Sequence, residues 1–301
     1  MKKKVKNWFI YWSARMILGL LWILGPRLAM GLGRRLGRLA FRWARVERER
    51  TLLHLGWAFE QMPEQERYEL ARGVFEHFGM AVGEVACARK IRPITEYVEL
   101  TPESRIVLED SLAQGRGVVF ITGHIGNWEL MARALAAFGF PINTIGQRSY
   151  DPRFTRLIKR FRDEGMVKTL WRGDPDLVEE MIKVLRRGEI MGLLIDQDTR
   201  VPGVFVDFFG RPAWTPTAGA VLARKVGCPV VMGFNYRNPD GKGYTIYINK
   251  LELCSEPDQQ KAISEDTQAM TRAIEQHIKN YPSQWVWMHR RWKTIPETKS
   301  E

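Results

Sequence analysis

From residue 100 onward, short apolar runs alternate with helical stretches, and this alternation limits the fold more than any other feature of the chain. Strand-like runs lie at 117–122, 141–145, 167–170, 190–195, 229–236 and 244–251. Around them, apolar residues at helical spacing predict helices over 103–113, 127–137, 152–164, 175–187, 215–226 and 260–280. The sequence therefore predicts an α/β fold, with a mostly parallel or mixed sheet that is flanked by helices.

The N-terminal region has a different character. Trp8 to Gly25 is an apolar stretch with one charge, Arg15, and aromatic residues near its ends. Residues 1–50 hold 13 of the 46 Lys and Arg residues but two of the 34 acids, and so carry most of the net charge of +12. Charge concentrated beside an apolar segment favours a membrane surface over nucleic acid as the partner.

We expect this segment to be a retained membrane anchor that spans the bilayer or lies in its interface. A cleaved signal peptide and a buried amphipathic helix are the alternatives, and no small-residue cleavage site precedes Pro26. The predicted organisation is an anchor with a basic amphipathic helix over 1–50, then a helical lead-in and a catalytic domain over 51–301. Three cysteines without metal-ligand spacing predict neither a zinc site nor a disulfide scaffold. No metal or cofactor is expected.

The stretch "ITGHIGNWEL" at 121–130 lies where a predicted strand gives way to a helix. Active sites of such sheets lie at the carboxyl ends of strands, and both His124 and Asp196 follow a predicted strand. A histidine can take a proton from a hydroxyl when a carboxylate holds its ring, so His124 and Glu129 are the candidate catalytic pair. The alternative is that both only cap the helix and serve its dipole. No G-x-S-x-G turn or nearby cysteine supplies a nucleophile, so we expect His124 to activate a hydroxyl of the substrate. Backbone N–H groups at the start of the helix would stabilise the oxyanion.

Five ordered blocks resemble the bacterial lipid A late acyltransferases, the lauroyl/myristoyl transferase family, within the wider acyltransferase group with an H-x4-D/E motif. They are "GHIGNWEL" (123–130), "IGQR" (145–148), "GEIMGLLIDQD" (188–198), "GVFVDFFGRPAWTPTAGAVLARKVGCPVV" (203–231) and "YPSQWVWMHRRWK" (281–293). The resemblance implies that His124 and Glu129 are catalytic. It implies substrate-binding roles for Asn127, Arg148, Arg162 and Asp196, with Arg160 as the alternative to Arg162. The segment after Arg148 departs from the family's usual Arg-Pro and Asn-Pro, which bears on the acceptor.

The resemblance further implies an acyl carrier protein as donor and a lipid A precursor as acceptor, at the cytoplasmic face of a bacterial inner membrane. Acylation of another glycolipid or phospholipid, or a catalytically silent membrane adaptor, are the alternatives. The aromatic and cationic pattern of "WVWMHRRWK" is typical of a bilayer interface. "VFVDFFG" is expected to form a core strand and a turn, and the other helical histidines (His54, His77, His277) to be packed or surface residues.

Overall fold

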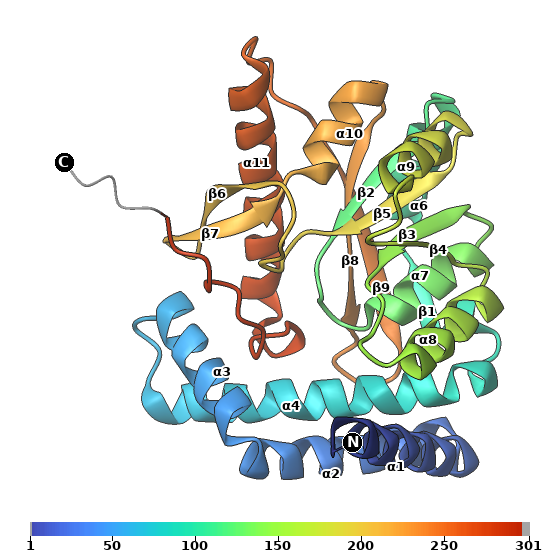
Figure 1. The fold of residues 1–301 in the computed structure, drawn as a ribbon, viewed down its shortest axis with the longest axis vertical. Coiled ribbons are helices and arrows are strands. Elements are labelled where there is room, and N and C mark those ends of the chain that lie inside the picture. The colour runs from blue at the N-terminus through green and yellow to red at the C-terminus, as the bar shows by residue number, and fades with distance from the viewer. Residues whose placement is uncertain (1, 297–301) are drawn as a thin grey trace.

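The computed structural model describes residues 2–296 and contains a seven-stranded mixed sheet (Figure 1). Its strand order is β1-β9-β8-β2-β5-β3-β4, and every neighbouring pair is parallel except β8 and β9. The strands are β1 (Val98–Leu100), β2 (Val118–Thr122), β3 (Ile142–Gly146), β4 (Lys168–Trp171), β5 (Ile190–Leu194), β8 (Val230–Arg237) and β9 (Tyr244–Leu251). The α/β prediction is confirmed, and each predicted strand is present; β1 is additional.

Helices cover both faces of the sheet, as the buried, near-continuous apolar strands require (Figure 1). Buried residues of α6 (Pro102–Ala113) and α7 (Trp128–Ala137) pack on one face, with the short α5 (Ile94–Tyr97). Those of α9 (Leu177–Arg186), α10 (Ala218–Val226) and α11 (Gln259–Asn280) pack on the other. The remaining helix of this part, α8 (Pro152–Glu164), precedes β4, and 3₁₀ turns lie at Ala88–Lys90 and Pro282–Gln284.

A two-stranded hairpin extends from the sheet in front of α11 (Figure 1). It consists of β6 (Gly203–Phe208) and β7 (Arg211–Pro216), joined by Phe209 and Gly210, both with positive φ. The expected core strand and turn in "VFVDFFG" is thus present. Residues 215–216, which were predicted to begin a helix, end β7 instead, because Thr215 is paired with Val204 across the hairpin.

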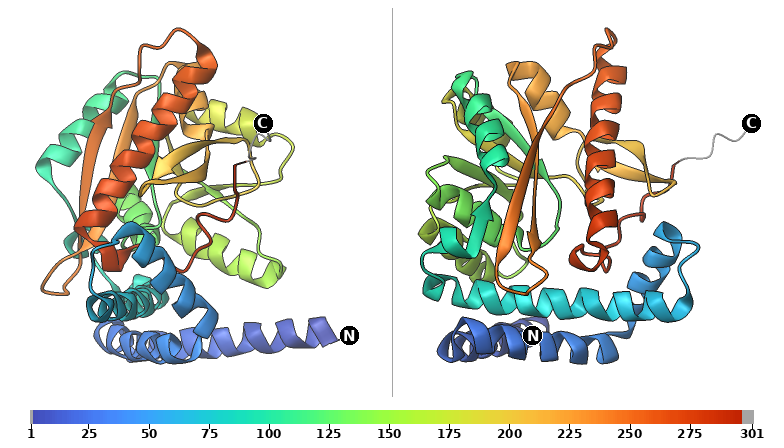
Figure 2. Two further views of the ribbon diagram at one scale, coloured as in Figure 1. Left: turned by 90° about the vertical axis from the view of Figure 1, so that its left-hand side faces the viewer. Right: turned by 180° about the vertical axis from the view of Figure 1, so that it is seen from behind.

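Four N-terminal helices form the base of the molecule: α1 (Lys2–Leu24), α2 (Pro26–Trp43), α3 (Arg45–Ala58) and α4 (Glu64–Cys87). Helix α4 runs across one end of the sheet, and α1 and α2 lie beneath it (Figures 1 and 2). Gly33 and Gly37 of α2 face Gly79 of α4, and a Cβ on Gly37 would lie 2.1 Å from the carbonyl oxygen of Phe75. The two helix backbones are therefore in direct contact, which only glycine permits.

The first helix exposes most of its apolar surface. Val5–Leu24 is, among the described residues, the one helix long and apolar enough to cross a membrane, and 6% of that window is buried. This exposure contradicts the alternative of a buried amphipathic helix. Helix α1 is attached by its second half, where Leu21 is buried and its carbonyl accepts from the Cys87 thiol, and by Tyr11, whose ring packs on Phe154 of α8 at 5.4 Å.

Candidate active site

The loop between β2 and α7 carries the histidine, and two of its glycines have a geometric purpose. A Cβ on Gly123 would lie 3.1 Å from a carboxylate oxygen of Asp196, so glycine lets that carboxylate approach the backbone. Gly126 has φ +61°, and a Cβ there would lie 2.0 Å from the carbonyl oxygen of Asn235. The loop can therefore be held tightly between β5 and β8 only with glycine at both positions.

His124 is held by Asp196, which lies just beyond the end of the neighbouring strand β5. The His124 ring Nδ1 lies 2.8 Å from Asp196 Oδ1, and the His124 backbone N–H donates to Oδ2 at 2.7 Å. Strands β2 and β5 are parallel, and Thr122 is aligned with Leu194, so the residues just beyond them meet at one edge. The side chain of His124 is 21% exposed, whereas Asp196 is buried.

Asp196 remains a carboxylate in spite of its burial. Burial alone would raise its pKa, but the charge of His124, the two His124 donors and the indole N–H of Trp285 together lower the pKa to about 2. The Trp285 Nε1–H donates to Oδ2 at 2.8 Å. Because an ionised carboxylate only accepts, Nδ1 of His124 must carry the proton of that hydrogen bond, which leaves Nε2 as the basic nitrogen.

Glu129 does not make the contact that the sequence predicted for it. Its two carboxylate oxygens accept from Nε and Nη2 of Arg162, at 3.0 and 2.6 Å, and the ring of His124 is held by Asp196 instead. The physical reason is that Glu129 lies in the first turn of α7, where the planar guanidinium of Arg162 from α8 matches both oxygens. The Nη1 nitrogen of Arg162 is buried and finds no acceptor among the described residues. The carboxylate that orients His124 is thus corrected to Asp196.

Asn127 is buried and supports the loop. Its side-chain oxygen caps α7 by accepting from the Leu130 N–H, and its amide nitrogen donates to Glu84 at 3.1 Å. Glu84 is itself buried and bonds both nitrogens of Arg237 on β8. The expected substrate contact of Asn127 is therefore not visible on its capping side, although Asn127 also borders a groove beneath α7.

Helix α4 also holds the loop from below. His77 Nε2 lies 3.0 Å from the Gly126 carbonyl oxygen, so this buried histidine donates to the loop backbone. Burial lowers the pKa of His77 to about 4, and it is neutral at pH 7. The helix that carries the N-terminal layer thus also fixes the catalytic loop. His54 and His277, like His77, are packed residues: His54 bonds the carbonyl of Trp287, and His277 bonds Tyr236.

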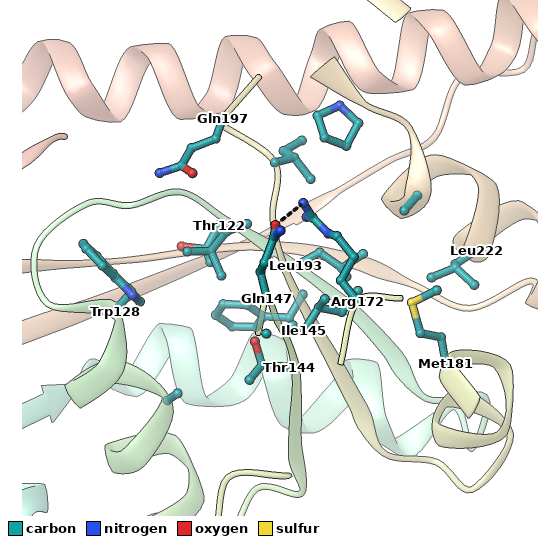
Figure 3. A pocket seen from close by; sticks show the side chains of 18 of the residues that line it. Thr122, Trp128, Thr144, Ile145, Gln147, Arg172, Met181, Leu193, Gln197 and Leu222 are labelled. Carbon is teal, nitrogen blue, oxygen red and sulfur yellow. Dashed lines mark hydrogen bonds between the residues drawn. The ribbon is translucent and has the colours of Figure 1, made fainter. Parts of the chain in front are cut away.

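An apolar cavity of about 490 Å³ is lined by His124, by residues of strands β2, β3 and β5, and by residues of helices α7, α9 and α10. Figure 3 shows part of its lining. Trp128 lies at one end, and Met181 and Leu222 lie at the other. This volume is in the range of small-molecule sites. The polar residues that line the cavity include two that the sequence analysis did not select, Gln147 and Arg172, which are joined by a 3.1 Å hydrogen bond.

The two predicted arginines occupy different places. Arg162 lines the cavity. Arg148 is exposed, pairs with Asp174 at 2.7 Å and is not among the residues that line the cavity. Its neighbour Gln147 lines the cavity instead, as expected where adjacent residues of an extended segment point to opposite sides. The alternative Arg160 pairs with Glu164 on the surface of α8.

The prediction that the C-terminal segment lies at a bilayer interface is wrong. Trp285, Trp287 and Arg291 are fully buried. Arg291 donates to the carbonyl of Trp214 and to the hydroxyl of Thr215 on β7, and a bridge between Ile125 and Trp285 ties the segment to the catalytic loop. The indole donor of Trp285 was missed because the pattern of tryptophans and cations also suits a membrane surface. The sequence feature that could have identified Trp285 is its position in the fifth of the blocks that resemble the family.

No group of three or more potential metal-ligating side chains occurs in the part of the chain that the structure describes. Cys87 and Cys228 are buried, and burial raises the pKa of each thiol. Neither cysteine lines the cavity.

Comparison with known proteins identifies the family. The model of the bacterial lipid A biosynthesis acyltransferases matches residues 2–294. The chain is 33% identical to the lipid A biosynthesis lauroyltransferase of Escherichia coli, over 95% of this chain and 93% of that protein. It is 25% identical to the palmitoleoyltransferase of the same bacterium, over 95% and 92%, and 27% identical to a phosphatidylinositol mannoside acyltransferase of Mycobacterium tuberculosis, over 62% and 57%. The chain is therefore an acyltransferase and belongs to the bacterial lipid A biosynthesis acyltransferase family.

Proposed function

We propose that this enzyme transfers a fatty acyl chain from acyl carrier protein to a hydroxyl of a lipid A precursor. The observation that carries the proposal is the hydrogen-bonded series Trp285, Asp196 and His124, which ends at an apolar cavity. Two of the lipid A relatives align over 95% of the chain, and the family model covers the N-terminal helices from residue 2. The mycobacterial relatives match a shorter part.

In the proposed reaction, Nε2 of His124 removes the proton of the acceptor hydroxyl. The oxygen attacks the thioester carbonyl, and the tetrahedral intermediate collapses by breaking the carbon–sulfur bond. The imidazolium returns its proton to the departing thiolate, so ester and thiol are the products. Asp196 stabilises the imidazolium through the 2.8 Å bond to Nδ1.

We assign Glu129 a different part from the one that its spacing predicted. By binding Nε and Nη2 of Arg162, it fixes the guanidinium and leaves Nη1 for a substrate oxygen, either the thioester carbonyl or a phosphate. The N–H groups of Trp128 and Glu129 are further candidates for the oxyanion, because Asn127 already accepts from the N–H groups of Leu130 and Met131.

We further propose that the apolar cavity receives the acyl chain of the donor. Its walls are formed by side chains such as Phe120, Leu135, Met181 and Leu222, with few polar groups. Burial of each methylene contributes about 0.8 kcal/mol, so the cavity depth would favour chains that fill it. The remaining predicted contact, Arg148, stays a proposal for a weak, solvent-exposed contact with a headgroup outside the cavity.

Residues 1–50 are proposed to hold the enzyme on the cytoplasmic side of the inner membrane. Helix α1 exposes Trp8, Phe9, Trp12 and Met16, and α2 exposes arginines on the same base of the molecule. Two of these, Arg34 and Arg38, are partly neutralised by Glu76. The others, together with the exposed tryptophans, suit the interface of an anionic bilayer.

The test is His124→Ala in the full chain, assayed with a labelled acyl thioester of acyl carrier protein and a Kdo-bearing lipid A precursor. Loss of the general base should lower kcat by at least about 10²-fold to 10⁴-fold. His277→Ala, a change of a packed histidine away from the cavity, is the matched control. Activity of His124→Ala within about tenfold of the wild-type rate would refute the mechanism.

The same assay addresses the alternative acceptors. The mycobacterial relatives are named for a mannosylated phospholipid, which keeps another glycolipid as the second candidate. A wild-type enzyme that acylates such a glycolipid and not the lipid A precursor would move the proposal to that acceptor. Absence of transfer to every lipid would favour the silent adaptor.

A further inference from the structure

A second apolar cavity of about 620 Å³ lies between α1, α4 and α8, outside the catalytic cavity. We call it the α1–α8 groove. Its walls are apolar side chains from all three helices: Leu18 and Trp22 of α1, Phe78 and Val82 of α4, and Leu157 and Phe161 of α8. It is therefore large enough, and apolar enough, for a hydrocarbon chain.

The α1–α8 groove meets the catalytic cavity at the start of α7. Trp128 and Glu129 line both cavities. The ring of Trp128 packs edge-on against the ring of His124, with 4.8 Å between centroids. A molecule that occupies the groove and reaches Trp128 is therefore next to the general base.

Helix α1, which exposes much of its apolar surface, forms one wall of the groove. Helix α1 lies at the base of the molecule (Figure 2). Many of its large apolar side chains are exposed. With α1 in a bilayer, a hydrocarbon chain can pass from the lipid into the groove without exposure to water, which avoids the cost of hydrating apolar surface.

The charges around the groove have a positive excess. Arg15, Arg89 and Arg160 line it, and Arg162 lies next to it through its contact with Glu129. Two carboxylates oppose these four arginines: Glu164 pairs with both Arg89 and Arg160, and Glu129 pairs with Arg162. An excess of guanidinium groups suits phosphate.

We propose that the α1–α8 groove binds a hydrocarbon chain of the acceptor, a phosphorylated membrane lipid, while the catalytic cavity takes the acyl chain of the donor. The two substrates then approach His124 from opposite sides of Trp128. This inference rests on the proposed function for the identity of the reaction, and it adds where the acceptor enters and which helices select it.

Gly19 offers a way to fill the groove without disturbing the fold. It lines the groove, and a Cβ there meets nothing within 4 Å. Gly31 of α2 also has open space for a Cβ and does not line the groove, so Gly31→Trp is the matched control. With the full chain in mixed micelles, Gly19→Trp should raise the KM for the lipid A precursor about tenfold or more, with the KM for acyl carrier protein thioester changed less than about twofold.

Direct binding separates this inference from the proposed function. Labelled lipid A precursor should bind His124→Ala protein about tenfold more weakly when Gly19→Trp is added, whether or not the wild-type enzyme turns over that lipid. A rise in KM for the donor alone would place the donor in the groove and overturn the proposal. Unchanged KM values and unchanged binding would also overturn it.

Arg15 tests the charge requirement. Arg15→Glu should weaken binding of the phosphorylated precursor about tenfold and leave binding of its dephosphorylated form within about twofold, because only a phosphate is repelled. Arg27→Glu makes the same change in an exposed residue of α2 away from the groove. An equal effect of both variants, or an equal effect on both lipids, would refute recognition of phosphate at Arg15.

Discussion

The tryptophans at the two ends of the chain lie in opposite environments. Trp8, Trp12 and Trp22 of α1 are each about half exposed, at 50, 47 and 47%. Trp285 and Trp287 are fully buried, and their indole N–H groups donate to Asp196 and to the carbonyl of Pro282. Both regions have cations close to their tryptophans in the sequence.

The difference shows that local composition does not decide whether an aromatic residue lies in a core or at a membrane. The C-terminal tryptophans are buried because a distant loop and strand receive them: Ile125 forms a bridge with Trp285, and Arg291 bonds β7. Helix α1 has contacts of this kind mainly along its second half and at Tyr11. Its remaining apolar surface faces outward and is left for a bilayer.

The largest effect on kcat is expected at Asp196, which the buried Trp285 and the catalytic His124 both contact. Asp196→Asn should lower kcat about 10³-fold to 10⁴-fold, because the amide cannot stabilise the imidazolium or enforce the Nδ1–H tautomer. Trp285→Phe removes one hydrogen bond to the same carboxylate and should cost roughly 10-fold to 150-fold. Steady-state kinetics of these two variants and of Glu129→Gln will show which of the three changes lowers kcat most.

That series also tests the correction of the orienting carboxylate. We expect Glu129→Gln to reduce activity less than Asp196→Asn does, with the stronger change in the KM of one substrate, since it loosens Arg162. A larger loss of kcat for Glu129→Gln than for Asp196→Asn would return the orienting role to Glu129. Thermal unfolding of each variant serves as the control for folding.

A second prediction compares the two groups of tryptophans directly. Trp287→Ala should lower the free energy of unfolding by about 3–5 kcal/mol, because it empties a fully buried site. Trp8→Ala should change it by less than about 0.5 kcal/mol, as surface substitutions do. Urea unfolding of the detergent-solubilised protein measures both.

Vesicle sedimentation supplies the reciprocal measurement. Trp8→Ala should release more protein from vesicles with anionic lipids, whereas Trp287→Ala protein that remains folded should sediment like the wild-type protein. If Trp8→Ala binds vesicles unchanged and destabilises the fold instead, helix α1 is a packed helix and its proposed place in the membrane is wrong.

The parts of the fold that could be predicted were those that depend on local pattern. The β-branched runs and amphipathic helices predicted the α/β class. The lead-in from residue 51 was predicted to be helical, and residues 59–63 divide it into α3 and α4. Strand β7, the hairpin partner of β6, was not predicted. The local sequence of residues 215–216 also suits the start of a helix, and only the pairing with β6 makes these residues a strand.

The site could be predicted as residues but not as contacts. His124 and Asp196 were both recognised as following strands, yet their pairing depends on β2 and β5 being neighbours, which strand order alone decides. Glu129 was chosen as the partner of His124 because the two residues are close in sequence. In the structure, Glu129 instead binds Arg162 of α8. Trp285 lies 89 residues from Asp196, so only the fold could reveal that donor.

The smallest effect is expected at Arg148, which the family resemblance selected and the structure places outside the catalytic cavity. Its guanidinium pairs with Asp174, with side chains 49 and 37% exposed. An ion pair of that exposure is screened by water and contributes little, so Arg148→Glu should change kcat/KM by less than about fivefold. Arg162→Lys, at the half-buried bidentate contact, should cost more, because lysine keeps the charge but loses the planar fork. A loss of tenfold or more for Arg148→Glu, confined to the KM of one substrate, would show that the exposed surface beyond β3 binds an anionic group of that substrate after all.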